Sequence, residues 1–596
     1  MTKVLVQIHD KRWNGVKLDY EKIINSALKN NAEVSVLLTD DKEIRALNKK
    51  YRNIDKPTNV LSFETGDPEI MGDIVLSFDT ILRESDEKKF AAHATHMLVH
   101  GALHLAGYDH IKDSDAIIME SREAKILRKI RWGKWVRRAA LFALGGLATL
   151  GFAPHYFWFM TIFAIGLAYK TARGYKDGFF FGAGYAAFAL SWMINSFFVD
   201  EAAAAIFGFL APVALIGLAI GGGIIFGLPF ALTAATKDYS WRRPFYFAAF
   251  SALVLWLRGW LFSGFPWNPL AGILLEYESA ANMTGVIGVV GTSFLIAGIS
   301  AAIFSKKLIP ILFFTLIFAA LSVVGFGRTM SYIPLAPTGK TARIVQPAIA
   351  QAFKSDRAMA EENLKIVLKL SDLPGEFDFI VWPESAYPYL VNEFQRLDFS
   401  FEKPLVFGGL RRGASGYYNS MFVLENGKIT AVYDKRHLVP FGEYSPLGPL
   451  VPVPGTFMFG DENQGAMGGF APSICYEIIF PDTAGAAAAD FIINITNDGW
   501  FGKSKGPHQH LAMARLRAIE SGLPVIRANY SGISAVINPL GEITARLPIG
   551  ERGIIDAPVP PKMESSAPSP NAAIITILLM AAAIRLTRRR AKPKRD

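Results

Sequence analysis

Residues 377–385 read FDFIVWPES, and this stretch carries the pattern that decides the fold of the C-terminal half of the chain. A short apolar run leads there to the carboxylate of Glu384, and a helical pattern precedes it at residues 356–372. The same rhythm recurs in other apolar runs, namely ARIVQP (342–347), PLVFGGL (404–410) and DFIINITND (490–498). Alternating strand-like and helical segments predict a layered α/β domain in which polar residues at strand ends form the site.

Three reactive side chains adjoin such runs: Glu384, Lys435 in YDKRHLVPFGEY (433–444) and Cys475 in ICYEIIF (474–480). Cys475 is the only cysteine in the chain, so an inert buried side chain, an intermolecular bridge and a reactive thiol are the alternatives. A thiol attacks as its thiolate, which a neighbouring base or positive charge generates. We therefore expect Glu384 to accept and return the thiol proton, and Lys435 to stabilise an oxyanion.

The composition points to a membrane protein, because 51% of the 596 residues are hydrophobic and only 19% are charged. Helices buried in a large soluble core are the alternative, which the length and low charge of the apolar runs disfavour. A spanning helix needs roughly 20 mostly apolar residues. Eight runs approach that length: 135–151, 155–170, 178–198, 203–233, 244–263, 282–303, 308–326 and 571–586.

The net charge of +10 lies at the flanks of these runs. RWGKWVRR (131–138) carries +4 and RLTRRRAKPKRD (585–596) carries a net +6. Basic residues also gather in alternate links, which predicts that residues 1–130 and the C-terminal tail are cytoplasmic and that residues 340–565 lie outside, in the periplasm. Residues 1–130 contain 20 basic and 21 acidic side chains, so their charge gives no sign of nucleic-acid binding.

Four motifs in order resemble the apolipoprotein N-acyltransferase family, a membrane-embedded branch of the nitrilase superfamily. They are VWPESAYP (381–388), DKRHLVPFGEY (434–444), ICYEIIF and residues 496–537. The resemblance covers about residues 135–590 and includes GFPWNP (264–269). It implies an αββα nitrilase-like domain without a cofactor. It also implies a catalytic triad and further functional positions, which are Glu384, Lys435 and Cys475, and Glu443, Tyr476 and Glu477, respectively.

The reaction that this resemblance implies is ping-pong. Cys475 would take an acyl chain from a membrane phospholipid as a thioester. The α-amine of the N-terminal diacylglyceryl-cysteine of an apolipoprotein would then accept the chain as an amide. Amide hydrolysis, as in soluble nitrilases, is the alternative, and the predicted membrane spans disfavour it.

A second motif, HGALHLAGYDH (100–110), predicts a metal site near the N-terminus. His100 and His104 lie on one helical face, and Gly107 can end the helix so that His110 becomes a third ligand. Three neutral imidazoles and a water make an open, catalytic type of zinc site. The spacing matches metzincin proteases, but Gly101 stands where their general-base glutamate would be, which disfavours proteolysis.

Residues 1–130 resemble the YbeY family of rRNA maturation endoribonucleases. LNKKYRNIDKPTNVLSFE (47–64) and GDIVLS (72–77) match in order beside the histidine motif. The resemblance implies a small α+β domain that binds Zn²⁺ through His100, His104 and His110, uses Arg52, and cleaves single-stranded rRNA of a ribosomal subunit. Another metal-dependent hydrolase and a ribosome-binding scaffold without nuclease activity are the alternatives.

Taken together, the sequence predicts a bifunctional, multidomain protein of the bacterial inner membrane. Residues 1–130 form the zinc domain, and residues 131–330 form the membrane domain with the first seven spans. Residues 340–565 form the acyltransferase domain, and residues 570–596 form the last span with the basic tail.

Overall fold

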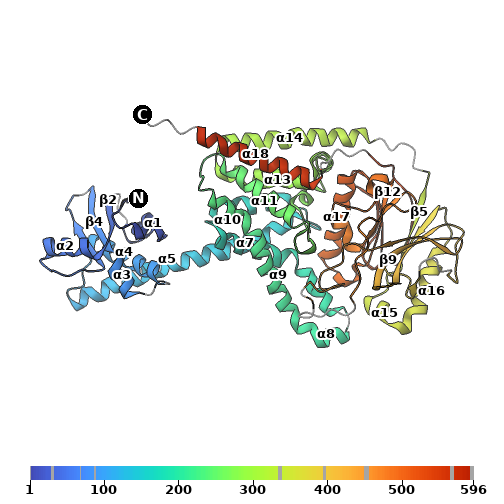
Figure 1. The fold of residues 1–596 in the computed structure, drawn as a ribbon, viewed down its shortest axis with the longest axis horizontal. Helices are drawn as coiled ribbons and strands as arrows, with labels where there is room; N and C mark the ends of the chain where they lie inside the picture. Colours follow the sequence, from blue (N-terminus) through green and yellow to red (C-terminus); the bar gives the residue numbers. More distant parts are fainter. Residues whose placement is uncertain are drawn as a thin grey trace. The chain divides into compact units, whose positions relative to one another are not determined.

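The computed structural model describes residues 2–28, 32–67, 69–85, 87, 89–199, 201–332, 339–392, 397–446, 448, 456–563 and 569–590. The chain forms two compact units, Met1–Arg138 and Ala139–Asp596 (Figure 1). Each unit has a hydrophobic core of its own.

The first unit is built on a four-stranded sheet in the order β1-β2-β4-β3, in which only β3 runs antiparallel to its neighbour. The strands are β1 (Lys3–Ile8), β2 (Glu33–Thr39), β3 (Val60–Glu64) and β4 (Ile70–Ser77). The helices are α1 (Tyr20–Ala27), α2 (Asp41–Arg52), α3 (Phe78–Glu84), α4 (Phe90–Leu105) and the start of α5 (Asp113–Ala148). Apolar side chains of α4, among them Leu98 and Leu103, share one core with Val36 and Ile74 of the sheet.

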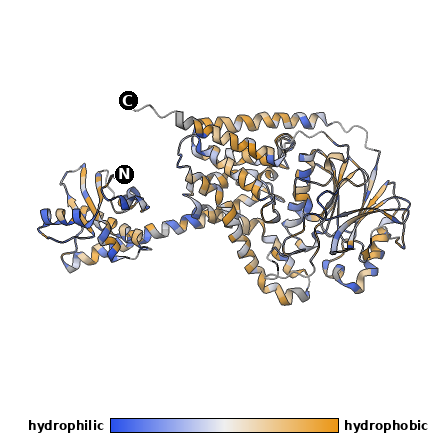
Figure 2. Ribbon diagram, in the orientation of Figure 1, coloured by the Kyte–Doolittle hydropathy of each residue, from blue (hydrophilic) through white to orange (hydrophobic). Residues whose placement is uncertain are grey.

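The second unit begins with a helical region whose ribbons are mostly hydrophobic (Figure 2). Its helices after α5 are α6 (Trp158–Thr171), α7 (Tyr175–Ala189), α8 (Glu201–Phe207), α9 (Ala211–Phe226), α10 (Leu228–Ala235), α11 (Arg243–Leu257), α12 (Glu278–Ala281), α13 (Thr284–Ser305), α14 (Leu308–Ser331) and, near the C-terminus, α18 (Pro570–Arg590). Within the described parts of the chain, three helical stretches are long and apolar enough to cross a membrane: Ala204–Ala235, Thr284–Ser305 and Leu308–Ser331.

Each of the eight predicted runs overlaps at least one helix, but the ends differ. The run at 203–233 is divided among several helical pieces, because Pro212 and Pro229 each stand in the first turn of a new helix. The run at 135–151 is the end of the 36-residue helix α5 and a 3-10 turn, η2 (Thr149–Gly151). The apolar helices Arg243–Leu257 and Pro570–Leu586 are shorter than the other three.

The predicted layered α/β domain is confirmed as two sheets that lie face to face between helices (Figure 1). The seven-stranded sheet has the order β10-β9-β8-β6-β5-β16, with β7 paired to β8, and the five-stranded sheet has the order β11-β12-β13-β14-β15. The first contains β5 (Thr341–Gln346), β6 (Phe379–Val381), β7 (Leu390–Val391), β8 (Leu405–Gly413), β9 (Gly416–Glu425), β10 (Lys428–Asp434) and β16 (Gly553–Pro558). The second contains β11 (Phe470–Ile474), β12 (Phe491–Thr496), β13 (Val525–Asn529), β14 (Ser534–Ile537) and β15 (Ile543–Leu547).

Facing apolar residues fill the space between the sheets, for example Ile344 and Val381 from one and Ile493 and Ile526 from the other. The outer faces are covered by helices, which gives the order helix, sheet, sheet, helix. The helices of this domain are α15 (Gln351–Ser355), α16 (Ala360–Ser371) and α17 (Lys505–Ser521). Strands buried on both faces explain why their sequences read as unbroken apolar runs.

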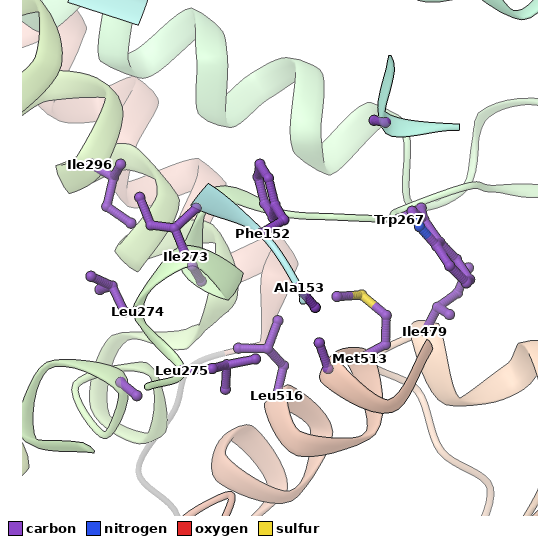
Figure 3. Packing of buried hydrophobic residues seen from close by; sticks show 14 of the residues in the cluster. Phe152, Ala153, Trp267, Ile273, Leu274, Leu275, Ile296, Ile479, Met513 and Leu516 are labelled. Carbon is purple, nitrogen blue, oxygen red and sulfur yellow. The ribbon is translucent and has the colours of Figure 1, made fainter. Parts of the chain in front are cut away.

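The helical region and α17 share one hydrophobic core (Figure 3). Phe152 and Ile273 of the helical region lie in the same cluster as Met513 and Leu516 of α17. Polar contacts cross the same boundary, since the indole nitrogens of Trp192 and Trp267 both donate to Gln509 Oε1, at 3.0 and 2.9 Å. The sandwich is therefore fixed against the helices.

Close helix contacts in this region depend on glycine. A Cβ atom built on Gly184 of α7 would lie 1.9 Å from the backbone oxygen of Phe142 in α5. Small residues allow two helix backbones to approach this closely, which strengthens packing between apolar helices.

We expect Gly184→Leu to lower the thermal stability of the detergent-purified protein, because inserting a side chain at a closed contact costs about 1–3 kcal/mol or more. Gly217→Leu in α9 is the matched control, since a Cβ there meets nothing within 4 Å. Thermal unfolding of both variants measures the difference. Equal melting temperatures would show that the α5–α7 contact is not closely packed.

Candidate functional site

The structure brings Glu384, Lys435 and Cys475 together at the ends of strands from both sheets. Glu384 follows β6, Lys435 follows β10, and Cys475 follows β11. Their exposed fractions are 7%, 1% and 9%, so all three reactive groups are buried. This is the arrangement that the apolar runs ending in polar residues predicted, because β6, β10 and β11 deliver their ends to the same edge of the sandwich.

The ammonium of Lys435 lies between two carboxylates. Its Nζ donates to Glu443 Oε1 at 2.9 Å and lies 3.5 Å from Glu384 Oε1. Burial alone would lower the pKa of Lys435, but the charges of Glu443 and Glu384 outweigh it and hold the pKa above its usual value. Lys435 is thus a permanent cation in the site.

The backbone of Cys475 is held in the left-handed region, with φ of 53°. Such a conformation costs a non-glycine residue about 1–3 kcal/mol and is maintained only by its surroundings. Burial and the Glu384 carboxylate raise the pKa of the thiol to about 12, against the opposing effect of Lys435. The resting sulfur is therefore protonated, and attack by it needs a base.

The side chains of Tyr476 and Glu477, the two predicted residues next to Cys475, form hydrogen bonds with backbone groups. Glu477 accepts hydrogen bonds from the backbone N–H groups of Ile474 at 2.7 Å and Arg436 at 2.6 Å. The Tyr476 hydroxyl donates to the backbone oxygen of Gly264 at 2.7 Å. Glu477 thus ties the loop after Lys435 to the loop of Cys475, and Tyr476 ties that loop to the GFPWNP segment of the helical region.

Sequence reasoning missed three groups of this site. Asn419 of β9 donates to both Glu384 and Glu443. Lys354 of α15 donates to the backbone oxygen of Glu384 at 3.2 Å, and burial lowers the pKa of this ammonium to about 8. His510 of α17 lies with Nε2 3.1 Å from the backbone oxygen of Cys475.

Only His510 had a signal in the sequence, because it lies inside the motif at 496–537. It is 1% exposed, and its Nδ1 lies 2.7 Å from Asp498 Oδ1. Nothing in the local sequence distinguishes Asn419 or Lys354 from an ordinary polar residue. Their position depends on how distant strands and helices meet.

The first unit gathers the three predicted histidines. Atoms of His100, His104 and His110 that could bind a metal all lie within 4.8 Å of one another. Gly107, with φ of 81°, follows α4 and allows the chain to turn back to His110. Three imidazole nitrogens at this separation fit one metal ion of the kind that histidine prefers.

Further contacts frame this cluster. Glu123 Oε1 lies 3.4 Å from His100 Nδ1 and 3.0 Å from His96 Nε2, so a carboxylate of α5 can orient a histidine of the cluster. A Cβ on Gly101 would lie 2.9 Å from Ser62 Oγ, and this close contact fits the glycine found there. Arg52 is the exposed last residue of α2, and the described residues show no hydrogen bond from it to the histidines.

Known proteins match both units. Residues 7–131 match the family Endoribonuclease YbeY, residues 144–302 match the N-terminal domain of apolipoprotein N-acyltransferases, and residues 341–568 match the carbon–nitrogen hydrolases. The apolipoprotein N-acyltransferase of Brucella melitensis is 36% identical over 453 residues, which are 68% of this chain and 83% of that protein. The enzyme of the same name from Bradyrhizobium diazoefficiens is 34% identical over 527 residues, 78% of this chain and 97% of that one.

Among solved structures, a carbon–nitrogen hydrolase superfamily protein from Xanthomonas campestris covers 41% of this chain and 95% of its own, with 18% identity and a TM-score of 0.29. The sequence matches confirm both resemblances that the motifs indicated. The chain therefore belongs to the apolipoprotein N-acyltransferase family and carries a YbeY endoribonuclease domain before its acyltransferase part.

Proposed function

We propose that the protein is bifunctional. Its acyltransferase part moves an acyl chain from a membrane phospholipid to the α-amine of the N-terminal diacylglyceryl-cysteine of an apolipoprotein. Its YbeY domain cleaves single-stranded rRNA during maturation of a ribosomal subunit. The observation that carries the first activity is the buried group of Glu384, Lys435 and Cys475 at converging strand ends.

The first half-reaction forms a thioester. Glu384 takes the thiol proton as the sulfur of Cys475 bonds to the ester carbonyl carbon of the phospholipid. The ammonium of Lys435 stabilises the negative oxygen of the tetrahedral intermediate. When the ester C–O bond breaks, Glu384 returns the proton to the oxygen of the departing lysophospholipid.

The second half-reaction forms the amide. The lipoprotein amine attacks the thioester carbon, Glu384 takes a proton from the nitrogen, and that proton passes to the sulfur as the C–S bond breaks. Burial of all three groups supports transfer rather than hydrolysis, because water has little access to the thioester. The apolar helices that share a core with α17 also favour lipid substrates over the small amides of soluble nitrilases.

Cys475→Ala should remove the intermediate and leave the fold intact, because it deletes one sulfur atom and leaves the backbone and the neighbouring side chains unchanged. Wild-type protein given phospholipid with a radiolabelled acyl chain, and no acceptor, should hold label that hydroxylamine releases. Cys475→Ala should hold none.

Ser473→Ala, two residues earlier at the buried end of β11, is the control and should label like wild type. Labelling of the Cys475→Ala protein at the wild-type level would mean that the nucleophile is another group. The proposed mechanism would then be wrong.

For the YbeY domain, we propose that His100, His104 and His110 hold Zn²⁺ and that Arg52 serves the reaction on RNA. The three convergent nitrogens fit such an ion. When bound, zinc would supply Lewis acidity and a water of lowered pKa. Glu123 would keep the His100 ring in the orientation that directs its other nitrogen to the metal.

We expect the full-length protein to contain about one zinc per chain and His104→Ala to lose it, because two imidazoles rarely retain zinc. Metal analysis by mass spectrometry measures both. His93→Ala is the control, since His93 pairs with Glu84 and is outside the three-histidine cluster. Full zinc content in the His104→Ala protein would refute this ligand set.

An rRNA-cleavage assay on the same proteins distinguishes the proposed endoribonuclease from the alternative functions of this domain. Cleavage that His104→Ala abolishes supports the endoribonuclease. Zinc binding without cleavage favours a ribosome-binding scaffold or another metal-dependent hydrolase.

We also propose an eight-span membrane protein with domains at residues 1–130, 131–330, 340–565 and 570–596. The first domain and the basic tail would lie in the cytoplasm, and the nitrilase-like domain would lie in the periplasm. The alternation of basic links and the overlap of every predicted run with a helix support this topology.

Reporter fusions test that topology. Fusions before Met1 and after Asp596 should report the cytoplasm. An insertion between Gly413 and Gly416, at the exposed turn between β8 and β9, should report the outside and disturb the fold little. A cytoplasmic signal from the turn would require an even number of crossings before residue 340.

A further inference from the structure

A buried histidine of α17 contacts the backbone of Cys475. His510 is 1% exposed, and its Nε2 lies 3.1 Å from the backbone oxygen of Cys475. A carbonyl oxygen only accepts hydrogen bonds, so Nε2 carries a hydrogen and donates it. The contact is therefore made with the peptide group that follows the reactive thiol, and not with the thiol itself.

The other ring nitrogen of His510 is fixed by a buried carboxylate. Nδ1 lies 2.7 Å from Oδ1 of Asp498, which follows β12. The second oxygen of Asp498 accepts hydrogen bonds from Arg527 at 2.9 Å and from Asn529 at 2.7 Å. These three partners of the network are at most 1% exposed. A ring that is held at both nitrogens in a closed polar network has one orientation, so its Nε2 hydrogen points to one place.

The same helix holds the end of the 3-10 turn η9 (Cys475–Ile479). Arg517 of α17 donates to the backbone oxygen of Ile478 at 3.5 Å and to that of Ile479 at 3.2 Å. The last two residues of the turn are therefore anchored independently of His510. Loss of the His510 contact should release the first residue of the turn and leave the rest in place.

Cys475 needs an anchor because of its own backbone. Its φ of 53° lies in the left-handed region, which a residue with a side chain keeps only where its surroundings impose it. Rotation about the backbone bonds of Cys475 moves Cβ and the sulfur. Glu384 and Lys435 are held by their own buried ion pair, at 3.5 Å, and would not follow a sulfur that moves away.

We propose that His510 is a positioning residue that holds the backbone of Cys475 in the left-handed conformation, and so keeps the sulfur in place beside Glu384 and Lys435. The inference rests on the proposed acyl transfer through Cys475. His510 touches no reacting atom and takes no proton in the reaction. It acts through the backbone oxygen of Cys475.

This role predicts a loss that is confined to the chemical step. Displacement of a reacting atom by about 1 Å can lower a rate about a hundredfold. Binding of the lipid should change little, because His510 is 1% exposed and offers the lipid almost no surface. The rate at saturating phospholipid should therefore fall, while the phospholipid concentration that gives half of that rate stays the same.

The test compares two amide substitutions in the full-length protein in detergent. The side-chain nitrogen of glutamine is as many bonds from Cα as Nε2 of histidine, and that of asparagine is as many as Nδ1. His510→Gln can therefore still donate to the oxygen of Cys475, whereas His510→Asn can reach only Asp498. The initial rate of hydroxylamine-sensitive labelling by phospholipid with a radiolabelled acyl chain is measured at several lipid concentrations. Thermal unfolding shows whether each variant is folded.

At saturating lipid, we expect His510→Asn to be labelled at least about tenfold more slowly than the wild type, with an unchanged half-saturating concentration. His510→Gln should be labelled at a rate close to that of the wild type, although it loses the contact with Asp498. His508→Gln is the matched control, because His508 lies on the same helix and is only partly buried. Its rate should equal that of the wild type.

Equal rates in the two folded His510 variants would overturn the proposal, because the position of the donor would then not matter. A slower rate in His510→Gln than in His510→Asn would also overturn it, since the contact with Asp498 would be the important one. So would a raised half-saturating concentration in His510→Asn, which would indicate a role in lipid binding.

If one variant does not fold, the other decides alone. A wild-type rate in His510→Asn, or a tenfold loss in His510→Gln, would contradict the proposal. Failure of both to fold would contradict it as well, because His510 would then serve the whole fold. These results are distinguishable from failure of the proposed function, in which case the wild-type protein itself would form no thioester.

Discussion

The buried ammonium of Lys435 and its two carboxylates are the constraint on which the acyltransferase domain depends. Charges taken out of water are costly unless each is paired and hydrogen-bonded, and removing one partner leaves an uncompensated charge. Lys435 is 1% exposed, so its partners have to arrive from elsewhere in the fold. Glu384 comes from the end of β6, Asn419 from β9 and Glu443 from the loop after β10.

Much of this arrangement follows from local patterns in the sequence. Apolar runs that end at Glu384, Lys435 and Cys475 predict that strand ends carry the reactive groups, and the histidine spacing with Gly107 predicts a three-ligand cluster. Both patterns depend on residues near one another in the chain. The two domain families were indicated by the sequence motifs quoted above, and the sequence matches confirm both families.

The features that the sequence does not reveal are contacts between residues far apart in the chain. Asn419 lies 35 residues from Glu384 and 24 from Glu443 along the chain, so only strand pairing brings the three together. The orientation of Glu477 depends in part on the same kind of contact, because one of its partners is the backbone N–H of Arg436, 41 residues away along the chain. The ends of the apolar helices are also set by packing, since Pro212 and Pro229 divide one apolar run that hydropathy alone treats as continuous.

The shared core of α17 and the helical region holds the sandwich in one position relative to the helices. Phe152, Trp267 and Leu516 belong to one hydrophobic cluster, so the sandwich packs directly against the helical region. The sulfur of Cys475 is connected to the apolar helices through the 3-10 turn η9 (Cys475–Ile479) and through α17, whose His510 lies at the backbone oxygen of Cys475. The position of the Cys475 sulfur along the direction of those helices is therefore set by the fold. In the proposed reaction, acyl donor and acceptor would both have to meet the sulfur at that one level, which would favour substrates whose reacting bond lies at the matching depth.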